Sequence, residues 1–139
     1  MLLPLATRIA TTTDPKILRN FAWNFGIKGA RAIHLFKKRM KQGDYFPPFL
    51  YISILNSCNL RCQGCWVDVD KPMVKIDLDR LNRLVNQAKD KGNAFFGILG
   101  GEPFMHPELF DFLAQHPDAS FQVFTNGQLI TAKKARMLR

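Results

Sequence analysis

The chain has 139 residues, of which 47% are hydrophobic, enough for one globular domain with a modest core. No run of eighteen apolar residues occurs, so the sequence predicts no membrane-spanning helix, and Met1 to Ala10 is too short for a signal peptide. We therefore expect a cytoplasmic protein, where free thiols stay reduced. The formal net charge is +9, and residues 1–47 hold nine Lys or Arg against two Asp, so the basic character belongs to the N-terminal segment.

Residues 1–47 are predicted to form this basic helical segment. Asp14-Pro15 is a good helix start, with Asp as the N-cap and Pro at the first helical position. We expect a first helix over residues 15–24, an interruption at Gly26 and Gly29, and a second helix over residues 28–42.

The second of these helices is amphipathic, with cations crowded at its end: Lys37, Lys38, Arg39 and Lys41. One reading is contact of residues 15–42 with a membrane surface, which would make the protein peripheral to the membrane. Other readings are docking of an acidic partner or nucleic acid, or packing of the helices on the main domain.

Pro47-Pro48 ends the helical pattern and marks a domain boundary, so residues 48–139 form the main domain. Phe49 to Leu55 is an almost continuous apolar run, typical of a strand buried on both faces. After Asp77 the apolar residues recur at helical spacing, which predicts a helix that ends near Lys91. Asp77 is its expected N-cap.

Two further strand and helix pairs follow. We expect strands at 94–99 and 121–125, a helix at 107–115, and a last helix capped by Thr131. Alternating strands and helices of this kind predict an α/β fold with parallel strands and right-handed crossovers.

The three cysteines, Cys58, Cys62 and Cys65, lie on one short loop after the first strand. Their odd number and close spacing disfavour disulfides, and three soft thiolates on one loop indicate zinc or an iron–sulfur cluster. A closed structural zinc site has four protein ligands, and this loop supplies three. His106 and His116 each sit beside a proline at a helix end, where we expect surface positions.

At these cysteines the sequence resembles the radical S-adenosylmethionine (radical SAM) family, whose signature is CxxxCxxC. Two further motifs extend the resemblance: Gly100-Gly101-Glu102-Pro103 looks like the family's GGEP motif, and Thr125-Asn126-Gly127 looks like its third-strand ending. Gly64 departs from the pattern, because the residue before the third cysteine is usually apolar.

The resemblance implies a partial, TIM-barrel-like (β/α) barrel, with residues 48–139 forming its first three units, truncated after the third. It implies that Cys58, Cys62 and Cys65 bind a 4Fe-4S cluster, with S-adenosylmethionine on the fourth iron. The implied cofactor-binding residues come from the other two motifs: Gly100, Gly101, Glu102, Pro103 and Asn126. The implied reaction is reductive cleavage of S-adenosylmethionine to a 5′-deoxyadenosyl radical, which abstracts hydrogen from an unknown substrate.

The implied partners are a one-electron reductant such as flavodoxin or ferredoxin, the substrate, and a companion chain that completes the barrel. The third strand would otherwise leave an open apolar edge over residues 121–124. The alternatives are an inactive fragment and a non-enzymatic iron–sulfur or zinc protein.

Overall fold

A computed structural model describes residues 7–9 and 11–138. Its centre is a sheet of three parallel strands, as the sequence predicts, and their order is β1-β2-β3. The strands are β1 (Leu50–Ser53), β2 (Phe95–Leu99) and β3 (Ser120–Val123). The helices are α2 (Pro15–Phe21), η1 (Ala22–Lys28), α3 (Gly29–Met40), α4 (Leu78–Asp90), η2 (Pro103–Met105), α5 (Leu109–Ala114) and α6 (Ala132–Met137).

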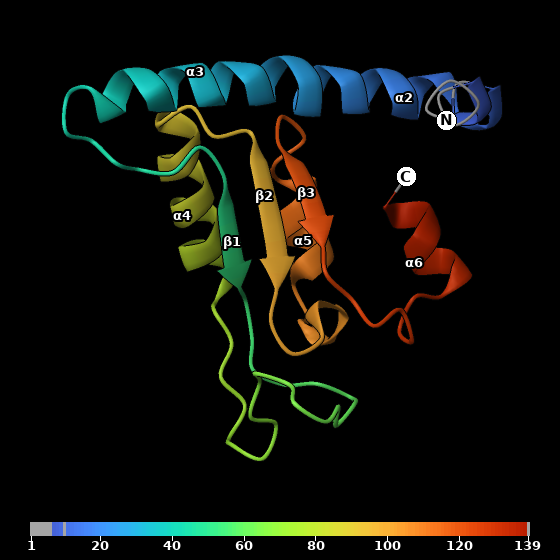
Figure 1. The fold of residues 1–139 in the computed structure, drawn as a ribbon. Coiled ribbons are helices and arrows are strands. Elements are labelled where there is room, and N and C mark those ends of the chain that lie inside the picture. The colour runs from blue at the N-terminus through green and yellow to red at the C-terminus, as the bar shows by residue number, and fades with distance from the viewer. Residues whose placement is uncertain (1–6, 10, 139) are drawn as a thin grey trace.

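Helices α4 and α5 cover one face of the sheet (Figure 1). The hydrophobic core lies between these helices and the strands. The predicted cap of α4 is confirmed, because the Asp77 side chain accepts a hydrogen bond of 2.8 Å from Arg80 N. The buried side chains come from both the strands and these helices: Ile52, Ile54, Leu55, Leu81, Val85, Ala88, Phe96, Ile98, Phe104, Leu109 and Phe112.

Residues 15–40 form one continuous helix, which corrects the expected interruption at Gly26 and Gly29. Between α2 and α3 the chain winds as the π-helix η1, and the cap residue Gly29 has helical angles of φ −62° and ψ −46°. A glycine costs only about 1 kcal/mol inside a helix, so packing of the helix on the sheet outweighs it. No helix of the described residues is long and apolar enough to cross a membrane.

This long helix lies across the amino ends of the strands (Figure 1). The ring of Phe25 meets that of Phe95 edge-on at 5.6 Å, and Lys28 Nζ donates to the Asp118 carbonyl oxygen at 2.5 Å. Farther along, Arg39 donates hydrogen bonds to the carbonyl oxygens of Lys91 and Phe46. The inner face of the helix is therefore a packing layer, which was one of the readings of this segment.

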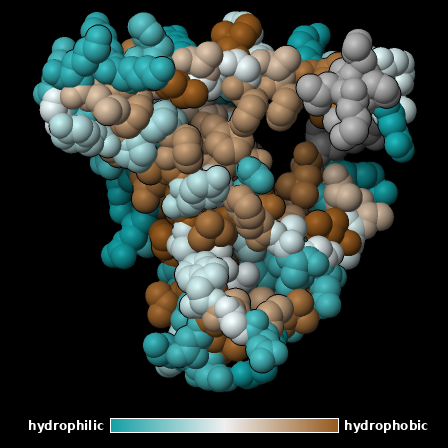
Figure 2. Space-filling view, viewed as in Figure 1, coloured by the Kyte–Doolittle hydropathy of each residue, from teal (hydrophilic) through white to brown (hydrophobic). Residues whose placement is uncertain are grey.

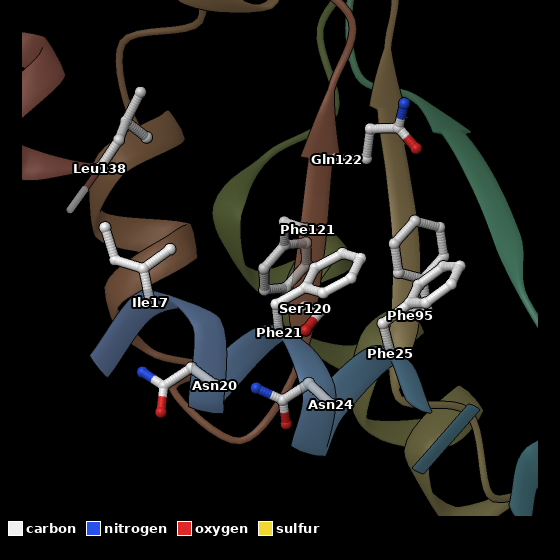
Figure 3. A pocket seen from close by; sticks show the side chains of 10 residues that line it. All are labelled: Ile17, Asn20, Phe21, Asn24, Phe25, Phe95, Ser120, Phe121, Gln122 and Leu138. Atoms are coloured by element: carbon white, nitrogen blue, oxygen red, sulfur yellow. The ribbon is translucent and has the colours of Figure 1, made fainter. Parts of the chain in front are cut away.

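The other face of the sheet is open, which corrects the expected burial of the first strand on both sides. Tyr51, in the middle of β1, is 54% exposed. Figure 2 shows hydrophobic side chains gathered between the long helix and the sheet. One hollow there has a volume of about 660 Å³, and Figure 3 shows Phe21 and Phe25 facing Phe121 and Phe95 across it. In a (β/α) barrel the helices cover the outer face of the strands, so this open face corresponds to the interior of the expected barrel.

His106 and His116 are each only 3% exposed, so the expected surface positions are wrong. The reason is that both rings carry polar contacts that only the tertiary structure supplies. His106 Nε2 lies 2.8 Å from the Ile76 carbonyl oxygen. His116 Nε2 lies 3.0 Å from Asn82 Oδ1, and its Nδ1 lies 3.2 Å from Lys89 Nζ.

We expect His116 to make the protein less stable as the pH falls below about 6.5. Burial, followed by the charge of Lys89, lowers the pKa of His116. The unfolded chain therefore binds a proton more readily than the folded one, and stability declines until the pH reaches the lowered pKa. In urea titrations between pH 7.5 and 5, His116→Gln should flatten this decline. His34→Gln, at an exposed position of α3, should leave it unchanged, and an equal decline in all three proteins would contradict the assignment.

Candidate functional site

The three motifs follow the three strands and meet at the carboxyl edge of the sheet, as predicted. The cysteine loop follows β1, the Gly100–Pro103 turn follows β2, and Thr125 and Asn126 follow β3. Figure 1 shows these loops at the end of the molecule opposite the long helix.

The glycine pair packs directly against the start of the cysteine loop. Gly101 N donates to the Leu55 carbonyl oxygen at 2.9 Å, and Glu102 N donates to that of Ser57 at 2.8 Å. A Cβ atom at Gly100 would collide with the backbone of Leu55, and one at Gly101 with that of Ser57. Gly100 also has a φ of +156°, which side-chain-bearing residues avoid. Two glycines therefore hold the second motif against the first.

The carboxylate of Glu102 joins the second motif to the third. Glu102 is fully buried, and its Oε1 accepts a hydrogen bond from Phe104 N at 2.9 Å. The Thr125 hydroxyl lies 2.8 and 2.9 Å from the two carboxylate oxygens, and Asn126 N donates to Oε2 at 2.9 Å. These donors fix the position of the carboxylate between the second and third motifs.

Asn126 reaches back to the cysteine loop. Its Nδ2 donates to Asn59 Oδ1 at 2.9 Å and lies 3.9 Å from Cys58 Sγ. Asn59 Nδ2 in turn donates to Gln128 Oε1 at 3.1 Å. The structure thus brings Glu102, Asn126 and Cys58 into one connected group.

Sequence reasoning missed three members of this group: Thr125, Asn59 and Gln128. Thr125 stands inside a recognised motif, so its hydroxyl could have been singled out as a partner for a buried acid. Asn59 and Gln128 carried no such signal, because exposed amides in loops are common.

All three cysteines are free thiols, with Cys58 half-buried and the other two exposed. The Leu60 N–H donates to Cys58 Sγ at 3.4 Å, and Cys65 N donates to the Cys62 carbonyl oxygen at 3.2 Å. In the described residues, no three His, Cys, Asp or Glu side chains are grouped closely enough to hold a metal ion. The donor set nevertheless suits an iron–sulfur cluster, because three unpaired thiols on one loop can converge when metal binds.

The rest of the cysteine loop is open to solvent. Arg61 and Asp70 form an ion pair there, and this hydrogen bond raises the pKa of the Arg61 guanidinium. Trp66 is 70% exposed, and no heavy atom lies within 4 Å of a Cβ built at Gly64. Solvated charges and an uncovered ring leave this side of the loop accessible to a bound molecule.

This protein has parallel strands, three thiols in the loop after the first strand, and a Gly-Gly-Glu turn after the second strand. Together these features define a class of barrel enzymes. Residues 52–139 match the family model described as "Radical SAM superfamily". The chain belongs to the radical SAM superfamily, whose members use a 4Fe-4S cluster and S-adenosylmethionine.

Relatives with assigned functions share this part of the chain. The tungsten-containing aldehyde ferredoxin oxidoreductase cofactor-modifying protein of Pyrococcus furiosus is 30% identical over 99 residues, covering 65% of this chain and 27% of the relative. GTP 3′,8-cyclase of Syntrophomonas wolfei is 30% identical over 92 residues, covering 60% and 28%. The solved structure of Streptococcus suis SuiB, bound to the precursor peptide SuiA, superposes with a TM-score of 0.62 at 27% identity, covering 78% and 26%. The chain spans about a quarter of the length of each of these proteins.

Proposed function

We propose that this chain supplies the cluster-binding and part of the cofactor-binding surface of a radical SAM enzyme. Cys58, Cys62 and Cys65 would each bind one iron of a 4Fe-4S cluster, and the amino and carboxylate groups of S-adenosylmethionine would bind the fourth. When bound and reduced, the cluster supplies the electron that cleaves S-adenosylmethionine and yields a 5′-deoxyadenosyl radical.

The observation that carries this proposal is the hydrogen-bonded link from Glu102 through Asn126 to the cysteine loop. Glu102 has a negative charge next to the position proposed for a cationic amino group, and charge-assisted hydrogen bonds are the strong ones. Gly100 and Gly101 let the turn lie directly against the cysteine loop, and Pro103 fixes the turn at the start of η2. Asn126 would orient the cofactor from the third strand.

We further propose that residues 48–139 are the first three units of the barrel and that residues 1–47 form a separate layer beneath it. The outer edge of β3 pairs with no strand of the described residues, so further strands, from this or a companion chain, can continue the sheet there. A one-electron reductant such as flavodoxin or ferredoxin would supply the electron. Trp23 and Ile27, 54% and 57% exposed on the long helix, favour contact with a membrane surface.

The direct test is anaerobic reconstitution with iron and sulfide, followed by addition of S-adenosylmethionine and a chemical reductant. We expect the reconstituted chain to bind S-adenosylmethionine, and 5′-deoxyadenosine to form when the remaining strands are present. Reconstituted protein that shows no affinity for S-adenosylmethionine would contradict the proposal.

Glu102→Gln should leave the iron content unchanged and weaken S-adenosylmethionine binding about ten- to a hundredfold, because it removes a charge-assisted hydrogen bond worth about 1.5–3 kcal/mol. Binding can be measured by calorimetry on reconstituted protein. The control is Glu108→Gln, which removes a more exposed carboxylate paired with Lys75 and should bind like the wild type. Loss of iron in Glu102→Gln but not in the control would instead assign Glu102 a structural role.

A further inference from the structure

A second cavity lies at the amino ends of the strands, away from the cysteine loop. Its volume is about 290 Å³. The lining residues come from the long helix, from the end of α4, and from the segments that enter β2 and β3: Lys28, Arg31, Lys89, Gly92, Asn93, Ala94 and Asp118. None of these residues belongs to the three radical SAM motifs.

The cavity is cationic. Lys28, Arg31 and Lys89 outnumber the single carboxylate of Asp118 and leave a net charge of +2. Asp118 Oδ1 lies 2.9 Å from Lys89 Nζ, so this carboxylate is already paired. The side chain of Arg31 has no hydrogen bond or ion pair with any residue that the structure describes. Unpaired guanidinium N–H groups are suited to bidentate binding of a phosphate or carboxylate.

Asn93 is a buried polar residue in the wall of this cavity. It is 4% exposed, and neither its Nδ2 nor its Oδ1 has a hydrogen-bond partner within the described part of the chain. A buried carboxamide without partners is rare and costs about 1–3 kcal/mol. Both atoms are closed to solvent, so the groups that an anion in the cavity can reach are those of Arg31 and the two lysines.

We propose that this cavity binds a phosphate group, with Arg31 as the main donor and Lys28 and Lys89 as charge partners. A phosphomonoester carries a charge of about −1.5 to −2 near neutral pH, which matches the net charge of the cavity. The group could belong to free phosphate or to a lipid headgroup. A lipid source is compatible with Trp23 and Ile27, which precede Arg31 at four-residue steps on the long helix.

The first measurement is thermal unfolding and calorimetry of the full chain with inorganic phosphate, against sodium chloride at equal ionic strength. We expect phosphate to stabilise the wild type beyond chloride, and Arg31→Gln to weaken phosphate binding about tenfold or more. Lys38→Gln is the matched control, because it removes an exposed cation of the same helix that does not line the cavity. Equal effects of phosphate and chloride, or equal losses in the two variants, would overturn the proposal.

The second measurement assigns the source of the phosphate group. Vesicles of phosphatidylcholine with phosphatidic acid are compared with phosphatidylcholine alone in a flotation assay. Binding to the anionic vesicles that falls in Arg31→Gln more than in Lys38→Gln supports a lipid headgroup, whereas phosphate binding without vesicle binding supports a free phosphate compound. Vesicle binding that is equal in both variants, without phosphate binding, counts against the cavity. Neither measurement requires iron or S-adenosylmethionine, so failure here is separate from failure of the proposed enzyme function.

Discussion

Cys62→Ala should abolish formation of an iron–sulfur cluster after anaerobic reconstitution. The wild type should bind about four iron and four sulfide per chain, because three protein thiolates hold three corners of a 4Fe-4S cluster. Cys62 is exposed and makes no side-chain hydrogen bond within the described residues, so its replacement should not unfold the chain. Iron and sulfide analysis, with the visible absorption of the protein, measures the loss.

The same outcome is expected for Cys58→Ala and Cys65→Ala, since each thiolate would bind a different iron. Gln63→Ala is the matched control, because it changes an exposed residue of the same loop without removing a thiol. Stoichiometric zinc without sulfide in the wild type would replace the cluster with the zinc alternative. Full iron loading of all three variants would exclude these cysteines as ligands.

Gly101→Ala should destabilise the protein by about 3 kcal/mol or more. The added Cβ would collide with the Ser57 carbonyl group and approach Cys58 N, both of them backbone atoms that cannot rotate away. Overpacking costs about 1–3 kcal/mol, and each lost hydrogen bond adds about 1 kcal/mol. The hydrogen bonds at risk are Gly101 N to Leu55 O and Glu102 N to Ser57 O.

Urea unfolding of the metal-free chain measures this effect. Gly26→Ala is the control, because no heavy atom lies within 4 Å of a Cβ built there. Gly26 lies inside a helix, so this variant should gain up to about 1 kcal/mol from helix propensity. A destabilisation of Gly101→Ala no larger than a few tenths of a kcal/mol would show that the two motifs do not depend on this close contact.

The order of elements and their starting points follow from local sequence. Asp14, Asp77 and Thr131 cap the helices at which they were predicted, because a cap needs only a short polar side chain and a backbone N–H two or three residues later. The three motifs were placed correctly after the strands for a similar reason. Apolar runs show where parallel strands end, and their carboxyl ends share one edge of the sheet.

Contacts between distant residues were decided only by the tertiary structure. The helix continues through Gly26 because packing against β2 outweighs local propensity, and His116 is buried because Asn82 and Lys89 supply its polar contacts. The sequence by itself identified the three thiols, the glycine pair and the acid as site residues, because their roles depend on residue type and spacing. Only folding joined Glu102 to Thr125 and Asn126. These residues lie 23 and 24 positions after Glu102 in the sequence, so their hydrogen bonds to it depend on how strands and loops pack.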